Sequence, residues 1–252
     1  MKYFHYVKKS IITILCFFVF IHYSLSDTIT EKRKFVLYAD LPIVPKIPII
    51  EIITNLTHEI ENKFSLTFTV KTLNVVSYIS DINGKGSVSG QKSQNNYFPE
   101  IYKYDYTRKN KDKSVYLKYL DGKLIEEKFT PSFDKNKLIP IKEEQKNNTI
   151  DPATLFLRLL DINKSNLCSE KIKVYDGKRR YDIIFEDKKI NDKTIECSAT
   201  QVRIGGYKKD KVDPLTNTDL IKIRYKNMPK SEFIEFYAKK GLIEISIQEK
   251  FN

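Results

Sequence analysis

Apolar and polar residues alternate along much of this chain, and the alternation predicts strands. In FSLTFTVKTL, residues 64–73, the first eight residues alternate between an apolar side chain and serine, threonine or lysine. A period of two places the apolar set on one face of a β-strand, so we expect a half-buried strand here. Residues 34–40 (KFVLYAD) and 194–204 (TIECSATQVRI) are also rich in strand-forming residues and predict two further strands.

Asp-Gly pairs between strand-like runs predict tight hairpins. Asp121-Gly122 lies in the middle of SVYLKYLDGKLIEEKF, and Asp176-Gly177 lies in KVYDGKRRYDIIF. Such a pair can supply the two positive-φ residues of a type I′ turn. We therefore expect both pairs to form the turns of antiparallel hairpins.

Residues 233–248 (FIEFYAKKGLIEISIQ) admit two readings. They predict a hairpin around Lys240-Gly241, or a helix over the first half that is capped by Ser231 and stopped by Gly241. The residue pattern alone leaves both open.

Two segments interrupt the strand pattern. Pro42, Pro45 and Pro48 predict that no long regular element lies between the first two strands, because proline cannot donate to a ladder. Residues 81–91 (DINGKGSVSGQ) predict a loop that contains a tight turn at its Asn-Gly pair.

A helix is predicted near the middle of the chain. Asp151 suits the N-cap position and Pro152 the first helical position. An apolar stripe follows, made by the i, i+4 pairs Leu155 with Leu159 and Phe156 with Leu160. Many antiparallel strands and a central helix predict a mainly β fold. We expect a curved antiparallel sheet, half-barrel or barrel-like, with the helix packed on it.

The N-terminal segment predicts export. Three lysines precede an uncharged, mostly apolar run over residues 11–21, and Ser24 and Ser26 have the small-residue spacing of a signal-peptidase site. We expect residues 1–26 to be a signal peptide cleaved near Ser26, and residues 27–252 to be a single β-rich domain in the periplasm. An uncleaved anchor is the alternative, although a membrane-spanning helix needs about 20 apolar residues.

The cysteines fit an oxidising compartment. Cys16 leaves with the signal segment, which leaves Cys168 and Cys197 in the mature chain. We expect these two to form a disulfide, and two unpaired buried thiols are the alternative. In the chain-entropy model such a bridge stabilises the fold by about 3–4 kcal/mol.

The net charge bears on partners. The formal charge is +12, and loss of the signal segment with its three lysines lowers it to +9. This charge permits contact with an anionic membrane surface, although scattered lysines are also typical of solvated faces. The chain has no nucleic-acid-binding motif, so we expect lipid or an envelope protein as partner and no nucleic acid.

Catalytic patterns are missing from the sequence. It has no nucleophile elbow, no Walker loop and no dinucleotide fingerprint. After signal cleavage the chain retains one histidine, His58, which lies in a polar context and is expected at the surface. We predict no catalytic, cofactor or metal site. The carboxylates that could form an acid–base pair are Asp151, Asp161, Asp176, Asp182 and Glu186.

Three cations follow the second Asp-Gly pair: Lys178, Arg179 and Arg180. One reading makes them solvated hairpin residues, with Asp182 as an ion-pair partner for either arginine. The other makes them a basic patch that contacts a phosphate-bearing lipid or an acidic partner. Arg179 and Arg180 would then anchor the ligand, because a guanidinium binds phosphate through two donors.

The motifs occur in an order that resembles a known family. Asp151-Pro152 and its helix are followed by Cys168, by the segment VYDGKRRYD, by Cys197 and by IGGY at residues 204–207. This layout is similar to the proteobacterial family of exported proteins called domain of unknown function 3108. The resemblance implies a periplasmic, curved β-sheet protein like the lipoprotein carriers of the bacterial envelope, and it implies no established activity.

These features together predict a non-enzymatic binding or assembly module of the cell envelope, which could hold an apolar, lipid-like ligand in the concave face of its sheet. A protein-interaction scaffold without a ligand is the alternative. A hydrolase that uses paired carboxylates is the third hypothesis.

Overall fold

The structure is a computed structural model. It describes residues 29–41, 44–59, 62–73, 77, 81–93, 96–161, 168–209, 218–228, 232–240 and 243–250. The predicted signal peptide and its cleavage site at Ser26 lie outside the described residues.

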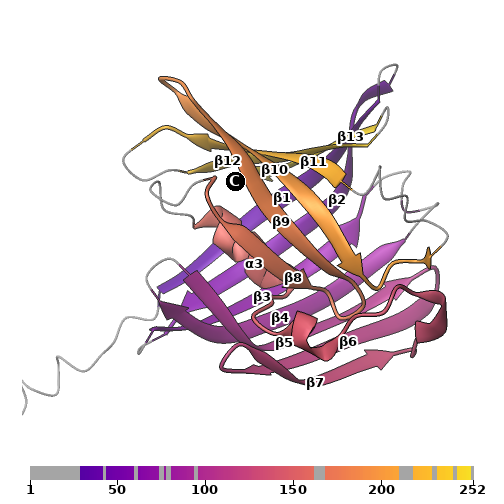
Figure 1. Ribbon diagram of the computed structural model, residues 1–252. Helices are drawn as coiled ribbons and strands as arrows, with labels where there is room; N and C mark the ends of the chain where they lie inside the picture. The colour runs from indigo at the N-terminus through magenta and orange to yellow at the C-terminus, as the bar shows by residue number, and fades with distance from the viewer. Residues whose placement is uncertain are drawn as a thin grey trace, which may run out of the picture.

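Within these residues, thirteen strands form one antiparallel sheet (Figure 1). The strands are β1 (Ile29–Leu41), β2 (Val44–His58), β3 (Lys63–Thr72), β4 (Ile82–Ser93), β5 (Asn96–Arg108), β6 (Lys111–Leu120), β7 (Lys123–Thr130), β8 (Lys171–Tyr175), β9 (Arg180–Ile190), β10 (Thr194–Gly205), β11 (Thr218–Lys226), β12 (Phe233–Lys240) and β13 (Ile243–Lys250). Their order is β7-β6-β5-β4-β3-β2-β1-β13-β12-β11-β10-β9-β8. All paired strands are consecutive in sequence except β1 and β13, and the consecutive strands β7 and β8 lie at opposite edges.

The sheet curves and holds the helix α3 (Pro152–Leu160) between its two halves (Figure 1). β7 and β8 are its two edge strands, so it is not closed into a barrel. The predicted fold class, a curved antiparallel sheet with a packed helix, is confirmed.

The helix begins where the sequence predicts. The Asp151 carboxylate accepts N–H bonds from Ala153 and Thr154, both at 2.9 Å, and a bond from the Thr154 hydroxyl at 2.6 Å. Pro152 occupies the first turn, where its missing N–H is not needed. Burial raises the pKa of the Asp151 carboxyl, and these donors oppose the rise by favouring the charged form.

Two buried apolar clusters fill the concave side of the sheet, and α3 contributes to both. The first contains Leu159 together with Phe35, Val174, Ile195, Cys197, Ile223 and Tyr225. The second contains Leu157 together with Phe64, Leu66, Val88, Tyr97 and Leu117. Among the described residues, the concave face is therefore filled by side chains alongside the helix.

The connector from β7 to α3 bridges the two edge strands. It carries two short helices, η2 (Lys135–Lys137) and η3 (Glu143–Lys146). Ile150 donates its N–H to the Lys173 carbonyl and accepts the N–H of Tyr175, both at 2.9 Å, which attaches the connector to β8. Asn148 donates to the Gly122 carbonyl at 2.7 Å, which attaches it to the β6–β7 turn. We call this contact region the seam.

Two hairpin predictions are confirmed. Asp121 and Gly122 have φ values of 49° and 74°, which suit the tight β6–β7 turn. β12 and β13 form the hairpin expected over residues 233–248, and β12 also pairs with β11. The helical alternative for its first half is wrong, because β12 pairs as a strand with β11 on one side and with β13 on the other. Ser231 and Gly241 lie outside the described residues.

The loop predicted over residues 81–91 is wrong, because β4 covers nearly all of it. Its glycines lie beneath aromatic side chains of the neighbouring strands. A Cβ at Gly84 would lie 2.7 Å from the Tyr106 Cβ, and a Cβ at Gly86 would collide with the Phe68 ring. The glycines thus make room for the rings and do not mark turns.

The prediction that the prolines prevent a long regular element is also wrong. Pro45 and Pro48 lie inside β2, and Pro42 lies outside the described residues. This part of β2 pairs with β1, whereas its ladder to β3 starts only at Ile50. The prolines are tolerated because they lie on a stretch with one neighbour, next to register shifts in the β1–β2 ladder.

Candidate binding groove

A hollow of about 470 Å³ opens beside the C-terminal end of α3. β1 to β5, the helix end, β12 and β13 contribute to its walls. Its apolar walls are formed by Leu56, Leu66, Leu157, Leu160 and Phe233, and ionisable side chains gather around them. We call this hollow the groove.

A lysine, a tyrosine and an aspartate form a bonded set in the groove. Lys92 and Tyr97 are directly opposite each other in the β4–β5 ladder, and Asp161 is the C-cap residue of α3. Asp161 Oδ2 lies 2.6 Å from Lys92 Nζ and accepts the Tyr97 hydroxyl at 2.7 Å. Lys92 also lies 4.9 Å from the centre of the Tyr97 ring. We call these three residues the groove triad.

The groove triad has a defined protonation pattern. Burial raises the pKa of the Tyr97 phenol well above its usual value, and its hydrogen bond to Asp161 raises it further. The phenol therefore stays a donor to Asp161 over the ordinary pH range. The lysine and the aspartate are only 24% and 30% exposed as side chains, so the ion pair faces the groove more than bulk water.

A second charged set lines the groove from β1 and β13. Arg33 Nε donates to Glu31 Oε1 at 2.7 Å and lies 3.8 Å from Glu249 Oε1. Burial raises the pKa of the Glu249 carboxyl, Arg33 lowers it, and Glu31 raises it. The arginine thus separates two carboxylates that would otherwise repel each other.

His58 also lines the groove, at the end of β2. It is half-buried, and its ring centre lies 6.3 Å from that of Tyr97. Burial lowers the pKa of its imidazole below 6.5, and the positive charge of Lys92 lowers it further. The histidine expected at the surface is therefore partly buried at the rim of the groove.

The five carboxylates considered for catalysis have separate surroundings. Asp161 lies in the groove, and Asp151 caps the helix. Asp176 accepts backbone N–H groups in its own turn, Asp182 pairs with Arg180, and Glu186 is exposed on β9. None of the five is paired with another of the set. Among the described residues, no group of three or more His, Cys, Asp or Glu could hold a metal ion.

The second Asp-Gly pair lies in a four-residue turn, so the expectation of a two-residue type I′ turn is wrong. β8 ends at Tyr175 and β9 begins at Arg180. The Asp176 carboxylate accepts the N–H groups of Lys178 at 2.8 Å and Arg179 at 2.6 Å, and Gly177 takes a φ of 92°. The side chain of Asp176 therefore shapes the turn, as in an Asx-turn.

Arg180 does not join Lys178 and Arg179 in an exposed patch. It is only 4% exposed, donates to the Gln145 carbonyl at 2.8 Å and lies 2.6 Å from Asp182 Oδ1. Its guanidinium thus holds the connector and β9 together. The prediction that Arg180 anchors a ligand is wrong because its donors are used inside the protein. Arg179 is exposed and Lys178 is half-buried.

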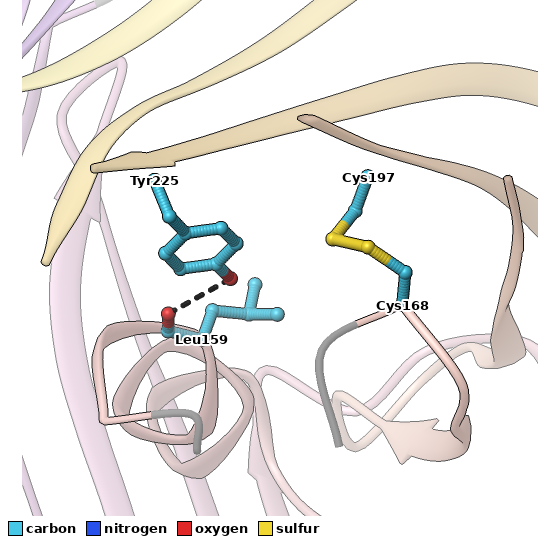
Figure 2. Close-up of a disulfide and its surroundings, with 4 residues drawn as sticks. All are labelled: Leu159, Cys168, Cys197 and Tyr225. Carbon is cyan, nitrogen blue, oxygen red and sulfur yellow. Dashed lines mark hydrogen bonds between the residues drawn. A yellow bond between two sulfur atoms is a disulfide. The ribbon is translucent and has the colours of Figure 1, made fainter. Parts of the chain in front are cut away.

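Cys168 and Cys197 form a disulfide (Figure 2), with their Cα atoms 5.2 Å apart. The bridge ties the segment after α3 to β10. Nearby, the Tyr225 hydroxyl donates to the Leu159 carbonyl at 3.0 Å, so β11 also holds the last turn of the helix. The groove therefore borders a helix end that a hydrogen bond from β11 holds in place.

Sequence reasoning missed most of the groove. Lys92 and Asp161 are 69 residues apart, and neither lies in a recognisable motif. Only the β4–β5 register, which the sequence does not reveal, places Lys92 and Tyr97 opposite each other.

Comparisons with known proteins identify a family. The model of the family described as "Protein of unknown function (DUF3108)" matches residues 41–219. No curated protein matches the chain. A beta-barrel-like protein of domain of unknown function DUF1849 from Brucella abortus is similar in structure, with a TM-score of 0.46 and 7% identity. The match covers 88% of this chain and 96% of that one. No helix among the described residues is long and apolar enough to cross a membrane.

Proposed function

The chain belongs to the DUF3108 family of proteins of unknown function, and we propose that it is an exported, non-enzymatic binding module. Its site is the groove, and its ligand is a small amphiphile. The apolar part of the ligand lies on Leu157, Leu160 and Phe233, and its polar end meets the groove triad.

One observation carries this proposal: an apolar wall and a bonded set of ionisable side chains border the same hollow. Binding sites for small molecules are typically about 300–1,000 Å³ and combine apolar walls with a few polar groups. The groove, at about 470 Å³, falls within this range. A long lipid lying along the whole concave face is not favoured, because α3 and the two apolar clusters fill that face.

The proposed compartment rests on the N-terminal segment and the disulfide. Residues 1–26 have the pattern of a secretory signal, and a disulfide persists in an oxidising environment such as the periplasm. Export to the periplasm is therefore part of the proposal.

The scaffold hypothesis has less support. The edge strand β7 carries Lys123, Glu126 and Lys128, and the last two form an ion pair at 2.6 Å. Charged edge strands resist the addition of a partner strand. The other edge, β8, already pairs with Ile150 of the connector.

Native mass spectrometry of the protein purified from its own periplasm, with lipid analysis of an organic extract, tests the proposal. We expect a bound amphiphile in a fixed ratio. In parallel, the empty protein should bind the fluorescent apolar probe N-phenyl-1-naphthylamine in the groove. The substitution Leu160→Phe, which adds bulk at the groove wall, should weaken probe binding by about tenfold or more.

Leu155→Phe is the matched control, because Leu155 lies on the same helix and packs against the first apolar cluster without lining the groove. It should leave probe affinity unchanged. Equal loss of affinity in both variants, or no loss in either, would overturn the assignment of the groove. Recovery of the native protein as an empty monomer with no probe binding would overturn the binding function itself.

A further inference from the structure

Two motif segments that the groove does not use meet elsewhere in the molecule. The β8–β9 turn lies against the residues that follow β10, at Gly206 and Tyr207. Gly206 has a φ of 80°, and a Cβ there would collide with the Lys178 carbonyl. Glycine is therefore required for this close approach, which brings Arg179 beside Tyr207.

Two arginines lie near the Tyr207 ring. The guanidinium carbon of Arg179 lies 5.7 Å from the ring centre, and that of Arg203 lies 5.3 Å away. Arg179 comes from the turn and Arg203 from β10. Lys178 Nζ lies 5.3 Å from the ring of Phe133 in the same region. The aromatic faces thus hold cations that project from different segments.

Like charges crowd this region. Burial lowers the pKa of the Lys178 ammonium, and Arg179, Lys113 and Lys208 lower it further. Asp176 acts in the opposite direction, but its carboxylate also accepts the N–H groups of Lys178 and Arg179. An anion would relieve this repulsion, because it would add negative charge where cations now face one another.

We propose that Lys178, Arg179 and Arg203, together the basic site, bind a phosphate-bearing head group, with Lys113 and Lys208 adding positive charge nearby. The forked guanidinium groups of Arg179 and Arg203 supply the donors for the phosphate oxygens, and the lysines supply charge. The pair of anchoring arginines is thus Arg179 with Arg203, in place of the buried Arg180. The basic site shares no residue with the groove, so this inference is independent of the proposed function.

The position of the basic site fits a surface role. Arg179 is exposed, whereas Lys178 and Arg203 are half-buried. A head group could therefore approach from solvent and meet donors that are already held in place. Held donors lose less entropy on binding than freely rotating ones.

Sedimentation of the exported protein, which lacks the predicted signal peptide, with vesicles tests the basic site. We expect binding to vesicles of phosphatidylglycerol in phosphatidylcholine and none to pure phosphatidylcholine. The double substitution Arg179→Gln with Arg203→Gln should weaken vesicle binding by about tenfold or more. Inorganic phosphate is the second probe, titrated by calorimetry, and it distinguishes a free anion from a lipid head group as the ligand.

The outer face of the sheet offers a matched control. Lys103 Nζ and Lys128 Nζ lie 5.7 and 5.8 Å from the centre of the Tyr116 ring, so they are also two cations near one tyrosine. Lys103→Gln with Lys128→Gln removes the same net charge and should retain binding. Thermal unfolding of each double variant verifies that it folds.

The outcomes separate the readings. If the arginine variant loses vesicle binding and the lysine variant retains it, the ligand is a lipid head group. If the wild-type protein binds phosphate but no vesicles, and the arginine variant loses phosphate binding, the ligand is a free anion. Equal loss in both double variants would show that only net charge matters and would overturn the basic site. Failure of the wild-type protein to bind either probe would also overturn it.

Discussion

Two sets of lysine, carboxylate and tyrosine occur in this molecule, and their surroundings differ. In the seam, Lys146 Nζ lies 3.1 Å from Glu127 Oε1, and Tyr175 donates its hydroxyl to Glu127 Oε2 at 2.7 Å. Glu143 is a second carboxylate for the lysine at 2.9 Å, and the Gly177 carbonyl is a second acceptor near the phenol at 2.9 Å. We call Lys146, Glu127 and Tyr175 the seam triad.

The groove triad uses the same types of residue in a more exposed setting. Lys92, Tyr97 and Asp161 bond to one another around a single carboxylate oxygen, Asp161 Oδ2. The side chain of Lys92 is 24% exposed, whereas that of Lys146 in the seam triad is 6% exposed. The groove triad therefore borders an accessible hollow, and the seam triad is enclosed between the connector and β7.

The difference teaches that the surroundings of a charge network, and not its residue types, indicate its role. An enclosed cation with two carboxylates holds elements together, since breaking such a set leaves a buried charge without a partner. A partly exposed ion pair contributes little to stability, and either of its charged groups can bind a ligand in place of its partner. The seam triad is thus expected to be structural and the groove triad to bind.

The substitution Lys146→Met should give the largest loss of stability. It leaves the Glu127 carboxylate without its buried cation, and the free energy of unfolding should fall by about 2–4 kcal/mol. Urea unfolding measures this change. Lys135→Met is the control, because Lys135 is 73% exposed as a side chain and lies 3.7 Å from the same Glu127 oxygen. That variant should lose less than about 1 kcal/mol. Similar losses in the two variants would contradict the structural role of the seam triad.

A pair of tyrosine substitutions sharpens the comparison. Tyr175→Phe removes a buried hydroxyl that lies between two acceptors and should lower the free energy of unfolding by about 1–2 kcal/mol. Tyr97→Phe removes one donor to Asp161 and should lower it by about 1 kcal/mol or less. Only Tyr97→Phe should also weaken probe binding in the groove. Weaker probe binding in the Tyr175 variant with unchanged binding in the Tyr97 variant would reverse the assigned roles.

Lys92→Met should separate binding from stability. Because the ion pair with Asp161 is half-open, its loss should change the free energy of unfolding by less than about 1 kcal/mol. Affinity for an amphiphile with a polar end should still fall severalfold, since the groove loses its cation beside the apolar wall. Urea unfolding and fluorescence titration of the same sample measure both. A loss of stability as large as that of Lys146→Met would remove the distinction between the two triads.

The sequence predicted the parts of the fold that depend on local patterns. The strand around Phe64 and Leu66 follows from a period of two, and the start of α3 follows from Asp151 and Pro152. β4 was missed because its glycines are required by rings of other strands, and local glycine content is typical of a loop. Only tertiary packing distinguishes glycines that make room for rings from glycines that mark a loop.

The charged residues were predicted less well for the same reason. Arg180 and its two cationic neighbours look alike in sequence, yet one side chain is enclosed by the connector. The connector and β9 meet only after the sheet has curved. The groove triad likewise joins β4, β5 and the helix end, so no local pattern could assign Lys92 a role different from that of any other lysine on the chain.

The smallest expected effect concerns His58 at the rim of the groove. Its folded-state pKa lies below 6.5, first because of burial and then because of Lys92. As the pH falls through 6.5, the unfolded chain binds a proton before the folded protein does, so the folded state loses stability. Thermal unfolding between neutral and mildly acidic pH should therefore show a small fall in Tm that His58→Gln lacks.

Glu249 acts on stability with the opposite sign as the pH falls, and the comparison with His58→Gln removes its contribution. Its folded-state pKa is raised by burial, so it takes up a proton before the unfolded chain does and adds stability as the pH falls. Both proteins contain Glu249, so the difference between their Tm curves isolates the histidine. Parallel curves would place His58 in a solvated environment, and the groove would then lack the burial that distinguishes a binding site from an open surface.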